Sequence, residues 1–434
     1  MSKSAALLLV LVFLTASCLI VFKPAFSSAD LAENSWTRRA PMHEARSGLG
    51  VAVVKGKIYA ISGWNSNYSS AGTNEMYNPA TDSWTTKAPI PTPRSNFGIA
   101  VYQNKIYCIG GSTTNGATGA NEVYDPETDT WETKTPMPTA SGYLDANVVD
   151  GKIYLIGATV NGIFASKEVY DIATDTWSTG STKTNFPLAF TSHASVVLDN
   201  KIYFIGGNKT QIYDPANDKW SYGAPIPWYL GGSVAATTGV FAPKRIYVIG
   251  GGGVLPYAYN YVYNPEADVW DRGADMPTAR GTLGIAVVDD VLYAIGGDSA
   301  WYFGVFGVNE QYTPFGYGTI PPVVDVVSPE NQRYNVTSVL LDFTVNKAVS
   351  WMGYSLDGQE TFTITGNTTL SGLSNGLHNV TVYARDEFEN MGASETVSFS
   401  VEVPFPVVPV AAVSVATIAV MGAVLLVYFR RRKR

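Results

Sequence analysis

The chain has little cysteine and little histidine. Only two of its 434 residues are cysteines, Cys18 and Cys108, and Cys18 lies in an N-terminal apolar segment that we expect to be removed. The remaining body therefore has no internal disulfide and must be stabilised by packing. Three histidines, His43, His193 and His378, are too few for a histidine-rich metal or redox centre, and lone histidines are more often surface or core residues. The composition favours a function without a bound cofactor or metal.

Charge is also scarce. Asp, Glu, Lys and Arg make up 15% of the residues, the net charge is −7, and basic residues are scattered except at the last five positions. This distribution argues against a nucleic-acid-binding surface. The sequence has instead 12% aromatic residues, 41 glycines and 24 prolines, which indicates β-rich globular domains with many turns.

The two ends of the chain are apolar. The run from Ala5 to Phe22 and the small residues that follow predict a signal peptide over residues 1–29, although the run is also long enough for an uncleaved signal anchor. Residues 407–429 carry no charge and precede five basic residues, so a transmembrane helix is expected over 404–429 with a cytoplasmic tail over 430–434. These features predict a single-pass cell-membrane protein with an extracellular body.

Five N-x-S/T sequons fit an exterior location and are potential glycosylation sites: Asn67, Asn208, Asn335, Asn367 and Asn379.

A repeat of 44 to 49 residues occupies the first two thirds of the chain. Its most regular phrase is apolar and ends in glycine, as in IYAISG, IYCIGG and LYAIGG, and it occurs six times. A second strand with a Tyr and a turn follows each phrase, as in EVYDPETDTW, and a third apolar strand precedes it. The tryptophan opens a fourth strand. Four antiparallel strands per repeat make one blade of a propeller.

These phrases resemble kelch repeats over residues 34–315, with Ala158 replacing the second glycine of the third repeat. The resemblance implies an all-β fold, a six-bladed propeller over residues 30–318. The sixth repeat ends at EQYTPFG without a tryptophan, whereas the N-terminal phrase NSWTRRAP carries Trp36 ahead of any repeat. We therefore expect the N-terminal strand to complete the last blade and close the ring.

A second all-β domain follows the propeller. Alternating strands over residues 319–403, such as HNVTVYARD, predict a β-sandwich and resemble the Ig-like stalk domains of prokaryotic surface proteins. The segment DEFENMG in this domain clusters carboxylates as a calcium loop does, but a hairpin turn is the simpler interpretation.

Three arginines stand at one position of repeats one, two and six: Arg46, Arg94 and Arg280. In kelch substrate adaptors an arginine at the matching position lines a pocket for acidic ligands, so the resemblance implies carboxylate binding here. The alternative is structural, because the same three repeats carry a glutamate at the start of the third strand: Glu75, Glu122 and Glu310. Repeat three has Glu168 without an arginine. A buried charge needs a partner, which favours pairing within each blade.

Aromatic residues in the loops of repeats one, five and six offer a second candidate surface. Trp64 and Tyr68, Trp301 and Tyr302, and Tyr257 and Tyr259 either contact a protein or sugar ligand or pack beneath their own loops.

The combined prediction is a cell-surface binding or adhesion module, a monomeric propeller that recognises a protein or a glycan and is not an enzyme. Galactose-oxidase-like copper chemistry would need two His, two Tyr and a Cys linked to one Tyr, whereas Cys108 lies in a buried strand where packing is the simpler role. The alternative is an exported sugar mutarotase or epimerase, because sialic acid mutarotases resemble this ring in size. Their acid–base chemistry needs a charged group at the channel mouth, which repeat spacing alone does not identify.

Overall fold

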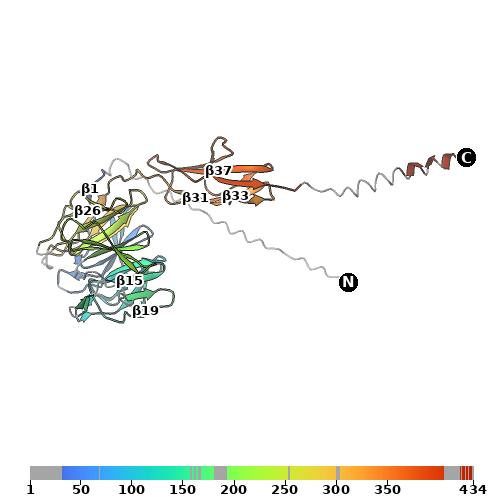
Figure 1. Ribbon diagram of the computed structural model, residues 1–434. Helices are drawn as coiled ribbons and strands as arrows, with labels where there is room; N and C mark the ends of the chain where they lie inside the picture. The colour runs from blue at the N-terminus through green and yellow to red at the C-terminus, as the bar shows by residue number, and fades with distance from the viewer. Residues whose placement is uncertain are drawn as a thin grey trace, which may run out of the picture. The chain divides into compact units, whose positions relative to one another are not determined.

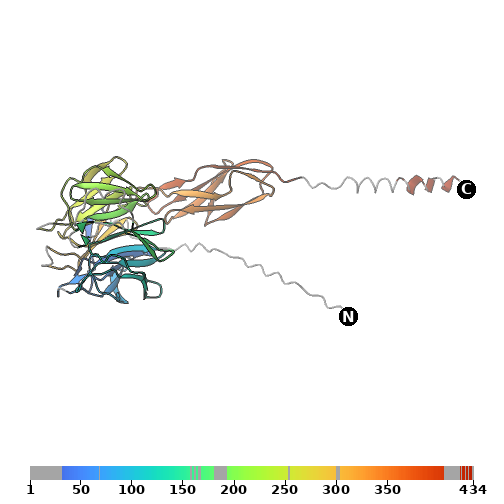
Figure 2. The ribbon, with the colours of Figure 1, turned by 60° about the horizontal axis from the view of Figure 1, so that its bottom comes forward.

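The computed structural model describes residues 32–404 except 68, 157–158, 161–162, 165–167, 180–192, 253–254 and 300–303, and also 421, 423–425, 427–428 and 430–432. These residues form two compact units that divide between Ile320 and Pro321 (Figures 1 and 2). The strands of the described residues pair antiparallel, with one short exception. β32 (Arg333–Tyr334) and β39 (Val397–Val401) pair parallel.

The first unit contains, in the described residues, six four-stranded antiparallel sheets, which we number as blades one to six. From the innermost strand outward they are: blade one, β3 (Gly50–Val54), β4 (Lys57–Ile61), β6 (Asn74–Asn78) and β7 (Ser83–Lys87); blade two, β8 (Gly98–Tyr102), β9 (Lys105–Ile109), β12 (Asn121–Asp125) and β13 (Thr130–Lys134); blade three, β14 (Asp145–Val149), β15 (Lys152–Ile156), β18 (Glu168–Asp171) and β19 (Thr176–Thr179); blade four, β20 (Ala194–Leu198), β21 (Lys201–Gly206), β22 (Lys209–Asp214) and β23 (Lys219–Gly223); blade five, β24 (Ser233–Thr238), β25 (Arg245–Gly250), β26 (Asn260–Asn264) and β27 (Val269–Arg272); blade six, β28 (Gly284–Val288), β29 (Val291–Ile295), β30 (Asn309–Thr313) and β1 (Ser35–Arg39).

The innermost strands contact one another in a closed ring, in which β28 of blade six lies against β3 of blade one. Clusters of buried apolar side chains lie between neighbouring blades. Ile58 and Tyr77 of blade one, for example, pack with Tyr293 and Ile295 of blade six. The repeated IY-x-IG phrase thus supplies the second strand of each blade, and its side chains bury the faces between blades.

The glycines that end this phrase allow the chain to turn tightly against the next blade. Gly110 has φ +66°, and a Cβ there would lie 2.4 Å from Leu144 Cδ1 and 2.8 Å from the Ser141 carbonyl oxygen. Only glycine meets both the left-handed conformation and this close approach without displacing its neighbours.

Strand β1 is the outermost strand of the last blade. It pairs antiparallel with β30, and Trp36 lies opposite Tyr312 with the two ring centroids 5.0 Å apart. In Figure 1 the label of β1 lies close to that of β26, in the part of the unit formed by the late repeats. The first described strand therefore completes the last sheet, which removes an unpaired edge from the ring.

A repeated clamp ties the described linkers to the blades that follow them. In blade two, Asp129 accepts hydrogen bonds from the Tyr124 hydroxyl and from the Ala88 N–H, at 2.9 Å for the latter, while Trp131 Nε1 donates to the Ala88 carbonyl at 2.9 Å. Both backbone groups of one linker residue are thereby satisfied by side chains of the next blade.

At the ring closure the N-terminal segment supplies the same clamp. Asn34 Oδ1 accepts from the Tyr312 hydroxyl at 2.8 Å and from the Ala274 N–H at 2.6 Å, and Trp36 Nε1 donates to the Ala274 carbonyl at 2.8 Å. Asn34 takes the place that aspartate has in other blades, with the same left-handed backbone (φ 52°, compared with 56° at Asp129).

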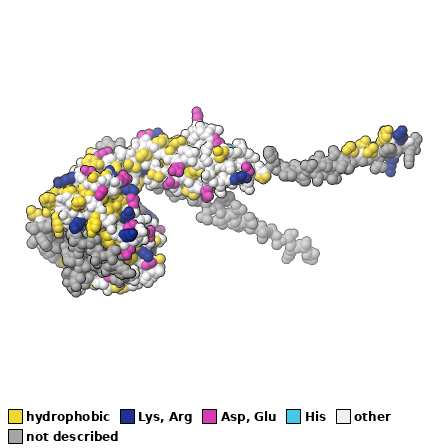
Figure 3. All heavy atoms as spheres, viewed as in Figure 1, with side chains coloured by type: hydrophobic (Ala, Val, Ile, Leu, Met, Phe, Trp, Pro, Cys, Tyr) yellow, Lys and Arg dark blue, Asp and Glu magenta, His cyan; other side chains and the backbone are white. Residues whose placement is uncertain are grey.

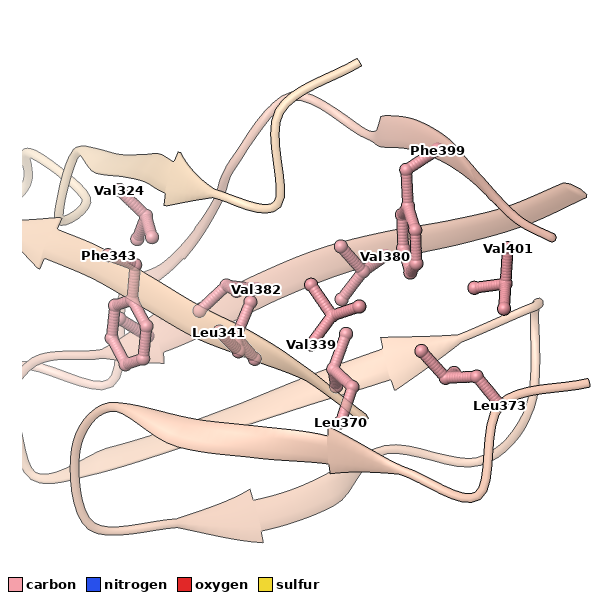
Figure 4. Close-up of a cluster of buried hydrophobic side chains, with 11 residues drawn as sticks. Val324, Val339, Leu341, Phe343, Leu370, Leu373, Val380, Val382, Phe399 and Val401 are labelled. Carbon is pink, nitrogen blue, oxygen red and sulfur yellow. The ribbon is translucent and has the colours of Figure 1, made fainter. Parts of the chain in front are cut away.

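The second unit is a two-sheet sandwich. One sheet has the order β31 (Val324–Ser328), β33 (Ser338–Val345), β36 (Thr368–Ser371); the other has β32, β39, β37 (Gly376–Arg385), β34 (Trp351–Leu356), β35 (Phe362–Ile364), with β38 (Met391–Ala393) pairing β37. Alternate residues of β33 and β37 are buried, and Figure 4 shows Leu341, Val380 and Val382 directed into the space between the sheets. This alternation is what a sandwich requires.

The predicted transmembrane helix over 404–429 and the single-pass membrane localisation are wrong. In the described part of the chain no helix is both long and apolar enough to span a bilayer. Hydropathy reports composition, whereas spanning a bilayer requires a continuous helix. The predicted signal peptide over 1–29 lies outside the described residues.

Candidate functional site

The linkers between blades and the loops that join the second and third strands emerge on one side of the ring, which we call the loop face. In blade one, β2 (Arg46–Ser47) of the linker pairs with β5 (Trp64–Asn65) of the loop. Two further short pairs belong to such loops: β10 (Ser112–Thr113) with β11 (Gly116–Ala117), and β16 (Thr159–Val160) with β17 (Ile163–Phe164). Of the predicted site residues in the propeller, Arg46, Arg94, Arg280 and Trp64 are described, and they belong to these linkers and loops.

The three predicted arginines are fully buried inside their own blades. Arg94 pairs with Glu122, and it also donates to the carbonyl oxygens of Thr92 (2.9 Å) and Cys108 (2.7 Å). The Thr92 hydroxyl donates to the other Glu122 oxygen at 2.7 Å. This arrangement leaves the pair bonded to its own blade rather than facing a ligand.

The same arrangement recurs in blades six and one. Arg280 pairs with Glu310 and donates to the Ala294 carbonyl at 2.9 Å, and Arg46 Nη2 lies 3.1 Å from Glu75 Oε2. Burial lowers the pKa of both arginines, and the partner carboxylates oppose that shift. Each arginine thus has the partner that the structural interpretation expects. Carboxylate binding by these arginines stays a prediction.

Blade three has the glutamate without the arginine. Ser141 stands at the arginine position, and no Lys or Arg of the described residues is paired with Glu168. Glu168 is 4% exposed and its Oε2 has no hydrogen-bond partner. Burial raises the pKa of this carboxyl group, although hydrogen bonds from Thr139 oppose the shift. Ionisation of the buried Glu168 is therefore less favourable than that of an exposed glutamate.

Of the predicted aromatic residues of the loops, Trp64, Tyr257 and Tyr259 lie in the described part of the chain. Tyr257 and Tyr259 stack on each other. Trp64 is half-buried on β5, opposite Ser47. Tyr68, Trp301 and Tyr302 lie outside the described residues. Their role in ligand binding stays a prediction.

Four of the five sequon asparagines are exposed: Asn67, Asn208, Asn335 and Asn367. Asn379 is half-buried, and its Oδ1 accepts from the Ser398 hydroxyl at 2.6 Å. Their modification stays a prediction.

A cavity of about 640 Å³ lies at the centre of the ring. Residues from all six blades line it, including linker residues such as Asn96, Tyr143 and Thr282 and loop residues such as Pro256 and Asp298. Because these segments belong to the loop face, the cavity opens there. Several of the remaining lining positions are glycines, which keep the ring wide at this end.

The cavity holds one close pair of titratable groups. His193 Nε2 lies 3.3 Å from Asp145 Oδ2, and Asn147 Nδ2 donates to the Ser195 hydroxyl at 2.7 Å. Burial raises the pKa of Asp145, while the nearby His193 and hydrogen bonds from Ser195 oppose the shift. A third of the Asp145 side chain is still exposed. The Asp145 carboxyl group is therefore partly accessible from the cavity, and its pKa lies above that of an ordinary aspartate.

Sequence reasoning missed Asp145 and treated His193 as a lone histidine. An alignment of the repeats within the chain contains the signal. The first residue of the innermost strand is Gly50, Gly98 and Gly284 in blades one, two and six, whereas blade three has Asp145. The preceding position is a large apolar residue in four blades and His193 in blade four. Blades three and four, which are neighbours, therefore depart from the repeat pattern at two adjacent positions of the repeat, with Asp145 at one and His193 at the other.

Cys108 and the acidic segment of the sandwich have defined surroundings. The described residues contain no group of three or more His, Cys, Asp or Glu arranged to hold a metal ion. Cys108 is buried, and burial raises the pKa of its thiol to about 12. In the sandwich segment DEFENMG, Asp386 is buried and lies 3.1 Å from Lys347 Nζ, as a structural pair does.

The visible surface agrees with the low charge of the sequence. Figure 3 shows basic and acidic side chains interspersed over both units, without a continuous basic area on this face.

Comparison with known proteins finds kelch repeats in part of the propeller. Residues 86–231 match the family described as FKB95, Kelch-repeats domain, and residues 45–91 match the Kelch motif. Kelch-like protein 35 of Mus musculus is 30% identical over 119 residues, which are 26% of this chain and 19% of that protein. Kelch-like protein terF of Aspergillus terreus is 27% identical over 222 residues, 41% of this chain and 47% of that protein.

The chain spans less than half the length of these curated relatives. Among solved structures, that entitled "Structure of YjhT" matches with a TM-score of 0.53 and 18% identity over 62% of this chain and 95% of the other, which indicates a shared fold. The motif matches, the relatives and the repeated blades agree, and the chain is a kelch-repeat protein.

Proposed function

We propose that this kelch propeller is a binding module that holds a protein segment or a carbohydrate in and above its central cavity. The observation that carries the proposal is the cavity of about 640 Å³ on the loop face, which has the volume of a typical ligand site. Two tyrosines that line it expose much of their rings, Tyr143 with 50% and Tyr229 with 69% of its surface accessible. Exposed aromatic side chains beside a cavity are typical of recognition surfaces.

Binding tests this proposal directly. The full chain is screened on a glycan array and a peptide library, and each ligand found is titrated calorimetrically. Tyr229→Ala is expected to weaken binding about tenfold or more, because a buried aromatic contact at an interface commonly contributes that much. Tyr222→Ala is the matched control, since Tyr222 is 58% exposed on β23 and does not line the cavity. Equal affinity of a ligand for the original chain, for Tyr229→Ala and for Tyr222→Ala would refute a binding site in the cavity.

A second candidate function is acid–base catalysis on a sugar, of the kind that mutarotases and epimerases perform. It is supported by the Asp145–His193 pair, whose 3.3 Å separation and raised aspartate pKa suit proton transfer to and from a ring hydroxyl. Exchange between anomers of sialic acid and of neutral aldoses is followed by NMR with the full chain and with Asp145→Asn. No acceleration over buffer for any of these sugars removes this candidate.

A further inference from the structure

Exposed aromatic residues gather beside the cavity on blade five. Trp228 and Tyr229 are consecutive in the linker between β23 and β24, and 50% and 69% of their surfaces are accessible. Tyr229 lines the cavity, whereas Trp228 lies outside it. The loop of the same blade contributes Pro256 to the cavity wall and continues into Tyr257 and Tyr259. The aromatic group therefore adjoins the cavity through two chain segments.

Trp228 is supported by an ordered stack of side chains. Its indole meets Tyr259 edge-on, with centroids 6.3 Å apart, and Tyr257 is stacked parallel to Tyr259 at 4.9 Å. The Arg272 guanidinium lies 4.4 Å from the centroid of Tyr259 and is held by Asp275 at 2.8 Å. A half-exposed indole with such support is fixed before a ligand arrives, which lowers the entropic cost of binding.

The charge of the cavity argues against an anionic ligand. Its lining residues include the carboxylates Asp145 and Asp298, and among the described lining residues there is no Lys or Arg. The buried arginines of blades one, two and six are paired with glutamates instead. The lining also contains His193, which lies beside Asp145, and neutral hydrogen-bonding side chains such as those of Asn96, Ser195 and Thr282. A carboxylate ligand would meet like charge here.

We propose that the ligand is an uncharged oligosaccharide of pyranose units, with one unit in the cavity against Tyr229 and the next unit stacked on the indole of Trp228. A pyranose has an apolar face of C–H groups that fits an aromatic ring and a rim of hydroxyls that fits carboxylate, amide and hydroxyl partners. The cavity provides the hydrogen-bonding partners, and the exposed indole of Trp228 beside it provides the aromatic face. This inference rests on the proposed binding function and names the ligand class of the same site.

The test is a calorimetric titration of the full chain with neutral saccharides of one, two and three units, built from glucose, galactose, mannose or N-acetylglucosamine. We expect binding to tighten about tenfold from one unit to two, as one added ring contact provides. Trp228→Ala is expected to abolish this gain and leave monosaccharide binding within about twofold of the original. Tyr229→Ala is expected to weaken binding of every length, and Tyr222→Ala to change none.

The outcomes separate this inference from the proposed function. The inference is overturned if none of these saccharides binds, if sialylated or uronic-acid oligosaccharides bind more tightly, or if the gain with length survives in Trp228→Ala. Peptide binding that is lost in Tyr229→Ala without any saccharide binding would also overturn it, while the proposed function would stand. Ligands of any class that bind equally well to Tyr229→Ala would instead refute the cavity as the site, and with it both proposals.

Discussion

The substitution Arg94→Ala distinguishes a structural arginine from a ligand-binding one. In blade two it would leave the Glu122 carboxylate, 3% exposed, without its cationic partner, and the carbonyl of Cys108 without the guanidinium donor. Removal of one member of a buried pair typically destabilises a protein by about 3–5 kcal/mol, because the other charge stays buried and uncompensated. We expect a loss of this size in the stability of blade two.

Cys108 offers an assay for this blade. Its thiol is buried on β9, so reagents label it only when the blade opens. With Cys18 replaced by Ser, the labelling rate of Cys108 in Arg94→Ala is expected to rise about a hundredfold or more, which is the conversion of the expected loss. The double variant Arg94→Met, Glu122→Leu is the control, because replacing both charges by apolar groups is often neutral or stabilising.

The reasoning would be refuted by an unchanged labelling rate in Arg94→Ala together with loss of binding to an acidic ligand. That result would mean that Arg94 contributes to recognition rather than to the blade. A double variant as unstable as Arg94→Ala would refute the account of Glu122 as an uncompensated charge.

Three further predictions concern other parts of the chain. Trp36→Ala is expected to destabilise the propeller by about 3 kcal/mol and to expose the N-terminal segment to limited proteolysis, whereas Trp84→Ala, which removes the same clamp inside a continuous blade, should leave that segment protected. Glu168→Gln is expected to raise the midpoint of thermal unfolding at pH 7. Burial raises the pKa of Glu168, so the stability of the original protein falls as the pH rises from the pKa of this group in the unfolded chain to its pKa in the folded chain. Glu122→Gln, which breaks an ion pair, should lower the midpoint. Burial lowers the pKa of His378, but hydrogen bonds with Ser374 and Asp357 outweigh this effect and raise the pKa. The stability of the sandwich should therefore fall as the pH rises through the raised pKa. A series of thermal unfolding measurements from pH 5 to 8 should show this fall in the original protein and not in His378→Gln.

The apolar phrases and turns of the repeat were sufficient to predict the blades. In IYCIGG the side chains of Ile106 and Cys108 are buried because every residue of a second strand faces a neighbouring blade, so the strand reads as a continuous apolar run. The tryptophan that the sixth repeat lacks was a further local signal, since Trp36 carries the same neighbours as the tryptophans that end the other repeats. The transmembrane helix shows the limit of such reasoning, because an uncharged run does not establish helix length.

The cavity residues could not be predicted in the same way. Asp145 and His193 are separated by 47 intervening positions, and only the packing of blade four on blade three brings both side chains together in the central cavity. The contact between Trp228 and Tyr259 also depends on tertiary packing, because Trp228 lies in a linker and Tyr259 in a loop of the loop face.

The amino-acid sequence by itself determined the local features of this protein, namely the strands, their turns and the repeat, because these depend on side chains close together in the chain. The repeats also indicated the Arg–Glu pairs and the glutamate without an arginine, but only the tertiary structure decided how deeply these charges are buried and which side chains share the central cavity. The physical reason is that burial and electrostatic interaction depend on distances in space, and those distances are set by the packing of one blade on the next.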